Sequence, residues 1–161
     1  MGKKILLNKN WLLFLAINFF FISSILGQSY NTGDYRSKGS GLSNLLSTWE
    51  IYDSGAWRDA ILADGIPGQN AGTYSVTIAA GHTVTIEHDI TSALTGSVHI
   101  FGTLVLGDTS PRVITWNSSL FVIETTGKVQ FIHQKTILKL PANAVIQVEE
   151  LGDITGACSN N

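Results

Sequence analysis

The sequence predicts an all-β protein, a right-handed parallel β-helix (solenoid) with an N-terminal hairpin cap. The main observation is a recurring unit in which a glycine and a polar residue precede two alternating apolar residues, as at 96–100 and 127–131. Alternation places every second side chain on one face of a strand, and the glycine turns the chain between strands. The unit recurs after 21 residues from Gly81 to Gly102 and after 25 from Gly102 to Gly127, about one coil of such folds. No long window combines helical spacing with capping signals, so almost no helix is expected beyond the first segment.

An antiparallel β-sandwich is the alternative, because short alternating strands separated by turns suit both folds. The Val, Ile and Leu side chains of these strands favour the solenoid, since like aliphatic side chains stack well from coil to coil. In that arrangement we expect one inward ladder with the successive layers Val84, Leu104, Val122 and Val145.

Residues 1–27 have the features of a secretory signal peptide. Three lysines give a basic start, an apolar run follows at 11–26, and small residues lead to Gly27. The run is shorter than the roughly 20 residues that cross a bilayer, and no basic stop-transfer cluster follows it. We therefore predict an exported protein, in the periplasm, on the cell surface or outside the cell, with no stable membrane span after cleavage.

Beyond residue 27 the chain is mildly acidic, with all 12 acidic but only seven of the 10 basic residues, a net charge of −5. It contains no Lys/Arg cluster that would attract nucleic acid. Cys158 is the only cysteine, which in an exported chain indicates an intermolecular bond, a free thiol or a missing partner. Residues 151–156 read as the entry to another strand with no cap after it, so we expect the solenoid coils at 74–161 to be incomplete at the C-terminus.

The elements follow in order along the mature chain. Residues 28–73 are predicted to form a polar segment with a short strand near 35–37 and an aromatic hairpin at 48–58, whose turn at 53–55 is Asp-Ser-Gly. Pro and Gly concentrate in 64–70, which is predicted as loop. Further strands are expected at 74–78, 83–88, 97–101, 103–106, 113–116, 120–124, 128–132, 136–140 and 144–149.

Several motifs lie in the first two thirds of the chain: Tyr35-Arg36-Ser37, Ser47-Thr48-Trp49-Glu50, Gly55-Ala56-Trp57, Val76-Thr77-Ile78 and Gly81-His82-Thr83-Val84-Thr85-Ile86. Together they resemble the N-terminal region of large secreted surface proteins of gliding bacteria that use type IX secretion. The segments 81–84 and 102–107 also resemble the eight-glycine extracellular β-domain. The resemblance covers about residues 35 to 107 and implies a two-tryptophan hairpin before a right-handed parallel β-helix, rather than a reaction. Members of that family are far longer and end in a sorting domain, which is absent here, so we expect a truncated member.

Aromatic side chains are the strongest candidates for ligand binding. Trp49, Tyr52 and Trp57 lie on the predicted hairpin, and exposed aromatic rings can stack on sugars. The alternative is that Trp49 and Trp57 cover the open first coil, because a solenoid must bury its apolar end. Tyr52 is then the residue expected to be most exposed.

The sequence contains no catalytic constellation. Neither a Gly-x-Ser-x-Gly elbow nor a zinc-type histidine spacing occurs, and we expect no metal or other cofactor. Acidic residues are more typical of solvated strand ends than of catalysis here; the candidates are Glu87, Asp89, Asp108, Glu124, Glu149, Glu150 and Asp153. Structural roles are expected for Gly81, His82, Gly96, Gly102 and Gly127.

These observations predict a non-catalytic cell-surface or matrix module that acts as a rigid spacer or adhesin. Polysaccharide or other surface proteins are the expected partners. The alternative is a carbohydrate-binding or polysaccharide-degrading protein whose active coils lie beyond residue 161.

Overall fold

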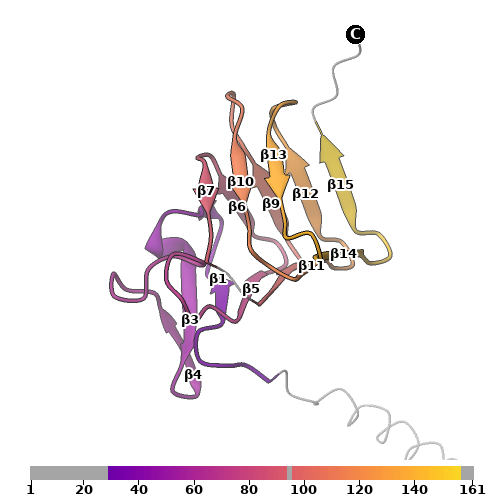
Figure 1. The fold of residues 1–161 in the computed structure, drawn as a ribbon. Helices are drawn as coiled ribbons and strands as arrows, with labels where there is room; N and C mark the ends of the chain where they lie inside the picture. Colours follow the sequence, from indigo (N-terminus) through magenta and orange to yellow (C-terminus); the bar gives the residue numbers. More distant parts are fainter. Residues whose placement is uncertain (1–28, 94–95, 157–161) are drawn as a thin grey trace, which may run out of the picture.

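The computed structural model describes residues 29–93 and 96–156, and within them the chain forms three sheets of short strands (Figure 1). In spatial order, sheet A contains β14 (Val145–Val148), β11 (Leu120–Ile123), β8 (Ser97–Ile100), β5 (Ser75–Ile78), β1 (Tyr35–Ser37), β3 (Trp49–Asp53) and β4 (Ala56–Asp59). Sheet B contains β15 (Asp153–Gly156), β12 (Lys128–Phe131), β9 (Thr103–Leu106), β6 (Thr83–Ile86) and β2 (Gly41–Leu42). Sheet C contains β13 (Ile137–Lys139), β10 (Val113–Thr115) and β7 (Ile90–Thr91).

Each coil passes from sheet A to sheet B to sheet C. Strands β5 to β7 form the first complete coil, β8 to β10 the second and β11 to β13 the third, and β14 and β15 begin a fourth. Neighbouring coils pair in parallel, so that in sheet A Ser75 lies beside Ser97, Ser97 beside Leu120, and Leu120 beside Val145. This stacking confirms the predicted β-solenoid and excludes the antiparallel sandwich.

The core lies inside the three sheets and consists of columns of apolar side chains. Val76, Val98 and Phe121 form one column in sheet A, and Val84 and Leu104 belong to another in sheet B. All of them are buried. Because the period-two alternation is repeated in register, each inward side chain rests on its counterpart one coil away.

The predicted ladder that starts at Val84 is wrong beyond Leu104. In sheet B, Leu104 lies beside Val129, whereas Val122 and Val145 belong to sheet A. The register step from β9 to β12 is 25 residues, so the shorter step from Leu104 to Val122 leads to another side of the solenoid.

The N-terminal end begins with part of a coil and is closed by the hairpin. Strand β1 pairs in parallel with β5, and β2 with β6. The chain then leaves the coil through a short 3-10 helix, η1 (Leu46–Thr48), and adds the antiparallel hairpin β3–β4 beside β1. Ser54 and Gly55 have φ values of 52° and 89°, as a two-residue type I′ turn requires. Trp49 and Ile51 of β3 are buried, and the predicted hairpin cap is confirmed.

The strands predicted from residue 74 onward are present, with ends within two residues of those predicted. The sequence does not predict β2 and β7, because two-residue strands leave no alternation to detect. The predicted signal peptide and Cys158 lie outside the described residues. In the described part of the chain, no helix has the length and apolar character needed to span a membrane.

Candidate functional site

Aromatic side chains gather on the outer side of the hairpin. Tyr52 pairs with Trp57 across β3 and β4 with ring centroids 5.4 Å apart, and Tyr30 packs against them at 5.4 and 5.0 Å, respectively. The guanidinium carbon of Arg36 lies 4.3 Å from the centre of the Trp57 ring, which is a cation–π geometry. We call Tyr30, Arg36, Tyr52 and Trp57 the aromatic face. All four residues are partly exposed, so the face remains accessible to a ligand.

Charged neighbours hold the aromatic face in place. Arg36 Nε donates to Glu50 Oε2 at 2.7 Å, and Lys38 Nζ donates to Asp59 Oδ1 at 2.7 Å. The register places Arg36 beside Glu50 and Glu50 beside Asp59 across β1, β3 and β4. Because such partly exposed pairs add little stability, the main effect of the Arg36–Glu50 pair here is to orient Arg36 over Trp57.

Trp49 does not belong to the aromatic face, although the sequence groups it with Tyr52 and Trp57. Its side chain is 1% exposed, and its Nε1 donates to Ser43 O at 2.9 Å. The alternation of β3 turns Trp49 inward, where it covers the first coil and lies on the opposite side of the hairpin from the aromatic face. Trp57 shows the opposite arrangement, since it packs outside with Tyr52 rather than over the coil.

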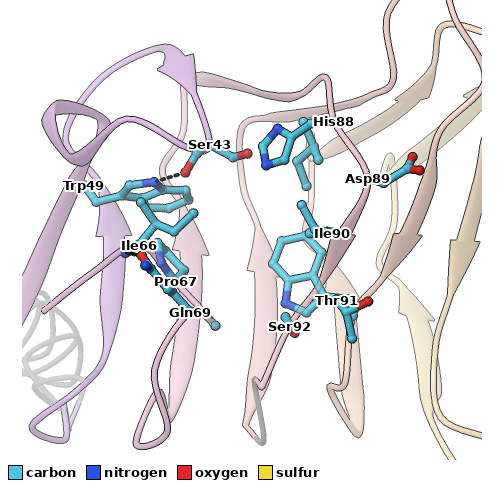
Figure 2. A pocket seen from close by; sticks show the side chains of 13 residues that line it. Ser43, Trp49, Ile66, Pro67, Gln69, His88, Asp89, Ile90, Thr91 and Ser92 are labelled. Carbon is cyan, nitrogen blue, oxygen red and sulfur yellow. Dashed lines mark hydrogen bonds between the residues drawn. The ribbon is translucent and has the colours of Figure 1, made fainter.

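A cavity of about 220 Å³ lies between the loop at 66–69 and the edge of sheet C (Figure 2). Its apolar walls include Trp49, Ile86 and Trp116. Two buried nitrogen atoms of residues that line it, His88 Nδ1 and Trp116 Nε1, have no hydrogen-bond partner among the described residues. Because buried polar atoms are nearly always paired, these two atoms mark the cavity as a candidate binding site.

A hydrogen-bonded chain of side chains crosses the outer face of sheet A. Ser97 Oγ lies 3.0 Å from His99 Nε2, and His99 Nδ1 lies 2.8 Å from Glu124 Oε1. The order resembles the triad of serine hydrolases. The Ser97 backbone N–H, however, donates to Tyr74 O at 3.1 Å and is not free to stabilise an oxyanion. We assign the chain as a structural link between the second and third coils.

Structural contacts surround His82 and the glycines that precede strands. His82 Nδ1 lies 2.9 Å from Ser37 Oγ, which connects the turn before β6 to β1. Gly81 has a φ of 79°, a value that favours glycine. A Cβ at the position before β8, β9 or β12 would overlap a backbone carbonyl oxygen; these residues are Gly96, Gly102 and Gly127.

The carboxylates considered from the sequence do not gather into a metal site. Within residues 29–93 and 96–156, no group of three His, Cys, Asp or Glu side chains is arranged to hold a metal ion. Asp89 Oδ1 accepts from Val113 N at 2.7 Å, and Asp108 pairs with Arg112 at 2.6 Å. The hydrogen bond from Arg112 lowers the pKa of Asp108 below its usual value. Both carboxylates therefore have structural partners.

Ionisable groups with shifted pKa values also lie beneath the hairpin. Arg58 donates to Asp64 at 2.6 Å and to Asp53 at 3.1 Å, and the backbone N–H of Ile61 donates to Asp64 at 2.8 Å. The Arg58 guanidinium holds the pKa of Asp64 below its usual value. Burial raises the pKa of Tyr35 to about 12, and its hydroxyl donates to Asp64 O at 2.9 Å. This network attaches the following loop to the first coil.

No protein-family model, curated protein or solved structure matches this chain. The aromatic face and the cavity therefore carry the functional interpretation. The sequence indicates Tyr52 and Trp57 of the aromatic face, because these hairpin residues are close along the chain, but it does not indicate Tyr30 or Arg36. The sequence does not indicate the cavity, since Trp49 and Trp116 come to line the same space only through the stacking of β10 on β7.

Proposed function

We propose that this protein is an exported cell-surface or matrix module that acts as a rigid, non-catalytic spacer or adhesin. The observation that carries the proposal is the uninterrupted apolar core of the parallel coils. In sheet A, the column Ile78, Ile100 and Ile123 is fully buried through three coils, and each strand is paired with the next. Such a stack of packed and hydrogen-bonded coils is stiff, which suits a spacer.

The aromatic face supports the adhesive part of the proposal. Tyr52 and Trp57 are partly exposed, and their position is fixed by Arg36 and its ion pair with Glu50. A fixed aromatic surface loses little conformational freedom on binding, and its rings can pack against the apolar faces of sugars. This face also favours a second candidate, a carbohydrate-binding protein.

The adhesive role is tested by incubating the purified protein with insoluble polysaccharides and measuring both its retention and the release of sugar. We expect retention without release. Trp57→Ala and Tyr52→Ala should abolish retention, while the matched control Tyr74→Ala, an exposed tyrosine outside the aromatic face, should retain it. Release of sugar would contradict the non-catalytic role.

The exported location is tested separately. An antibody raised against the purified protein should label intact cells that express it, and external protease should remove the label. In cells that lack an outer membrane, labelling seen only after permeabilisation would contradict export.

A further inference from the structure

We infer that the cavity beside sheet C binds a single sugar unit, a six-membered ring with several hydroxyl groups. The cavity is lined from the inner side of the hairpin by Trp49, whereas the aromatic face lies on the outer side with Trp57. The inference does not depend on the spacer or adhesin role, and the two sites share no residue.

The cavity exists because the first, partial coil has no strand in sheet C. Strands β1 and β2 precede β5 and β6, but among the described residues sheet C begins with β7. The loop at 66–69 takes the missing place at one end only. Ala93 N donates to Gly68 O at 2.7 Å, and a Cβ on Gly68 would lie 2.7 Å from Ser92 Cβ. The rest of the β7 edge, from Asp89 to Thr91, lines the cavity instead.

The dimensions and the apolar walls suit one ring. A cavity of roughly 150 Å³ holds benzene, so the 220 Å³ here accommodate a six-membered ring with substituents. Figure 2 shows Trp49, Ile66 and Pro67 on one side of the space and His88 and Ile90 on the other. Such opposed walls fit a flat ligand whose two faces carry C–H groups.

The polar atoms require a ligand with hydroxyl groups. Trp116 is 4% exposed, and its Nε1 is a donor only, so it needs an acceptor. His88 Nδ1 donates or accepts according to the tautomer. A hydroxyl group serves either atom, and the side chain of Gln69 beside the cavity offers a further partner. A purely apolar ligand would leave both nitrogen atoms unpaired at a cost in affinity.

Geometry argues against a peptide as the occupant. An extended peptide paired with the β7 edge would present its hydrogen-bonding groups to β7 rather than to Trp116 and His88. The sugar unit is therefore the occupant that the lining favours.

The test is a titration of the purified protein with glucose, galactose, mannose and N-acetylglucosamine, each added separately. Tryptophan fluorescence reports the binding, because Trp49 and Trp116 both line the cavity. We expect a saturable change with at least one sugar. Trp116→Phe keeps an aromatic ring but removes the N–H, and it should weaken binding roughly tenfold. The matched control Trp57→Phe should leave the dissociation constant unchanged.

A second measurement shows that a loss of binding is not a loss of folding. Without sugar, Trp116→Phe should keep the cooperative unfolding transition and the circular dichroism spectrum of the original chain, with a somewhat lower midpoint because the smaller ring packs less well against Phe121. No saturable response to any of the four sugars would overturn the inference, as would binding that Trp57→Phe weakens and Trp116→Phe does not. Binding of the unstructured peptide Lys-Thr-Phe-Thr-Lys that outcompetes every sugar would also overturn it. If Trp57→Ala loses retention on polysaccharide but still binds the free sugar, the loss concerns the aromatic face and not the cavity.

Discussion

The second coil and the described part of the fourth coil carry the same alternation in different surroundings. Ile100 in β8 is fully buried between β5 and β11, whereas Val148 in β14, at the equivalent register position, is 48% exposed and, within residues 29–93 and 96–156, has a neighbouring strand on one side only. Figure 1 places β14 and β15 at the end of the stack that lies away from the hairpin. Burial in a solenoid therefore comes from the coil on each side, and the same apolar residue contributes to stability only where both are present.

Replacing an isoleucine by alanine in the third coil and in the fourth coil tests whether a second neighbouring coil supplies the stability. Ile123→Ala removes a fully buried side chain from the third coil and should lower the free energy of unfolding by about 2–5 kcal/mol. Ile146→Ala, in the fourth coil at 53% exposure, should cost less than about 1 kcal/mol. Denaturant unfolding followed by circular dichroism measures both. Equal losses would mean that the fourth coil is covered in solution.

Two glycines allow the third and fourth coils to be compared by how closely the backbones of neighbouring coils approach each other. A Cβ on Gly127 would overlap the carbonyl oxygen of Ile100 in the coil below, so Gly127→Ala should cost about 1–3 kcal/mol or more. Gly156 in β15 has no atom within contact distance of a Cβ, and Gly156→Ala should change stability by less than about 0.5 kcal/mol. Unfolding midpoints of the two variants give the answer. A Gly127→Ala variant as stable as the original chain would contradict the close packing of the coils.

The sequence predicts the repeated part of this fold well because one rule acts in every coil. A glycine before an alternating strand can be recognised from the local sequence alone, and this motif predicts the positions of β8, β9 and β12. The assignment of Val122 to a column with Leu104 is wrong because the number of residues per coil varies. The alternation of apolar residues in a strand also does not show which of the three sheets the strand joins.

The sites are less predictable than the fold. Tyr52 and Trp57 are adjacent across a two-residue turn, so their contact follows from local sequence. The inward direction of Trp49 depends on which face of the hairpin meets the coil, and alternation alone gives two equal choices. Trp116 and His88 meet near the cavity only because β10 stacks on β7, a short strand that has no detectable sequence pattern.

The exposed apolar end of the stack should also influence association. Among the residues that the structure describes, β13, β14 and β15 are the last strands of their sheets, and Val148 and Ile154 are about half exposed there. Unpaired strand edges with apolar neighbours promote contact between molecules. We expect the purified protein to elute from a sizing column ahead of a monomer, and Val148→Lys to shift it toward the monomer. The control Thr83→Lys, an exposed position in the first coil, should leave elution unchanged.

The smallest expected effect concerns the opposite, covered end and its response to acid. Because Arg58 lowers the pKa of Asp64 in the folded chain, the ion pair stabilises the protein above the usual pKa of an aspartate, and this contribution is lost as the pH falls through the lowered value. Asp64→Asn should therefore reduce stability at pH 7 and lose less on acidification than the original chain does. Thermal unfolding at pH 7 and pH 3 measures the difference. Asp59→Asn, which removes a more exposed partner of Lys38, should leave the acid response nearly unchanged, so an equal response in both variants would refute a special role for Asp64.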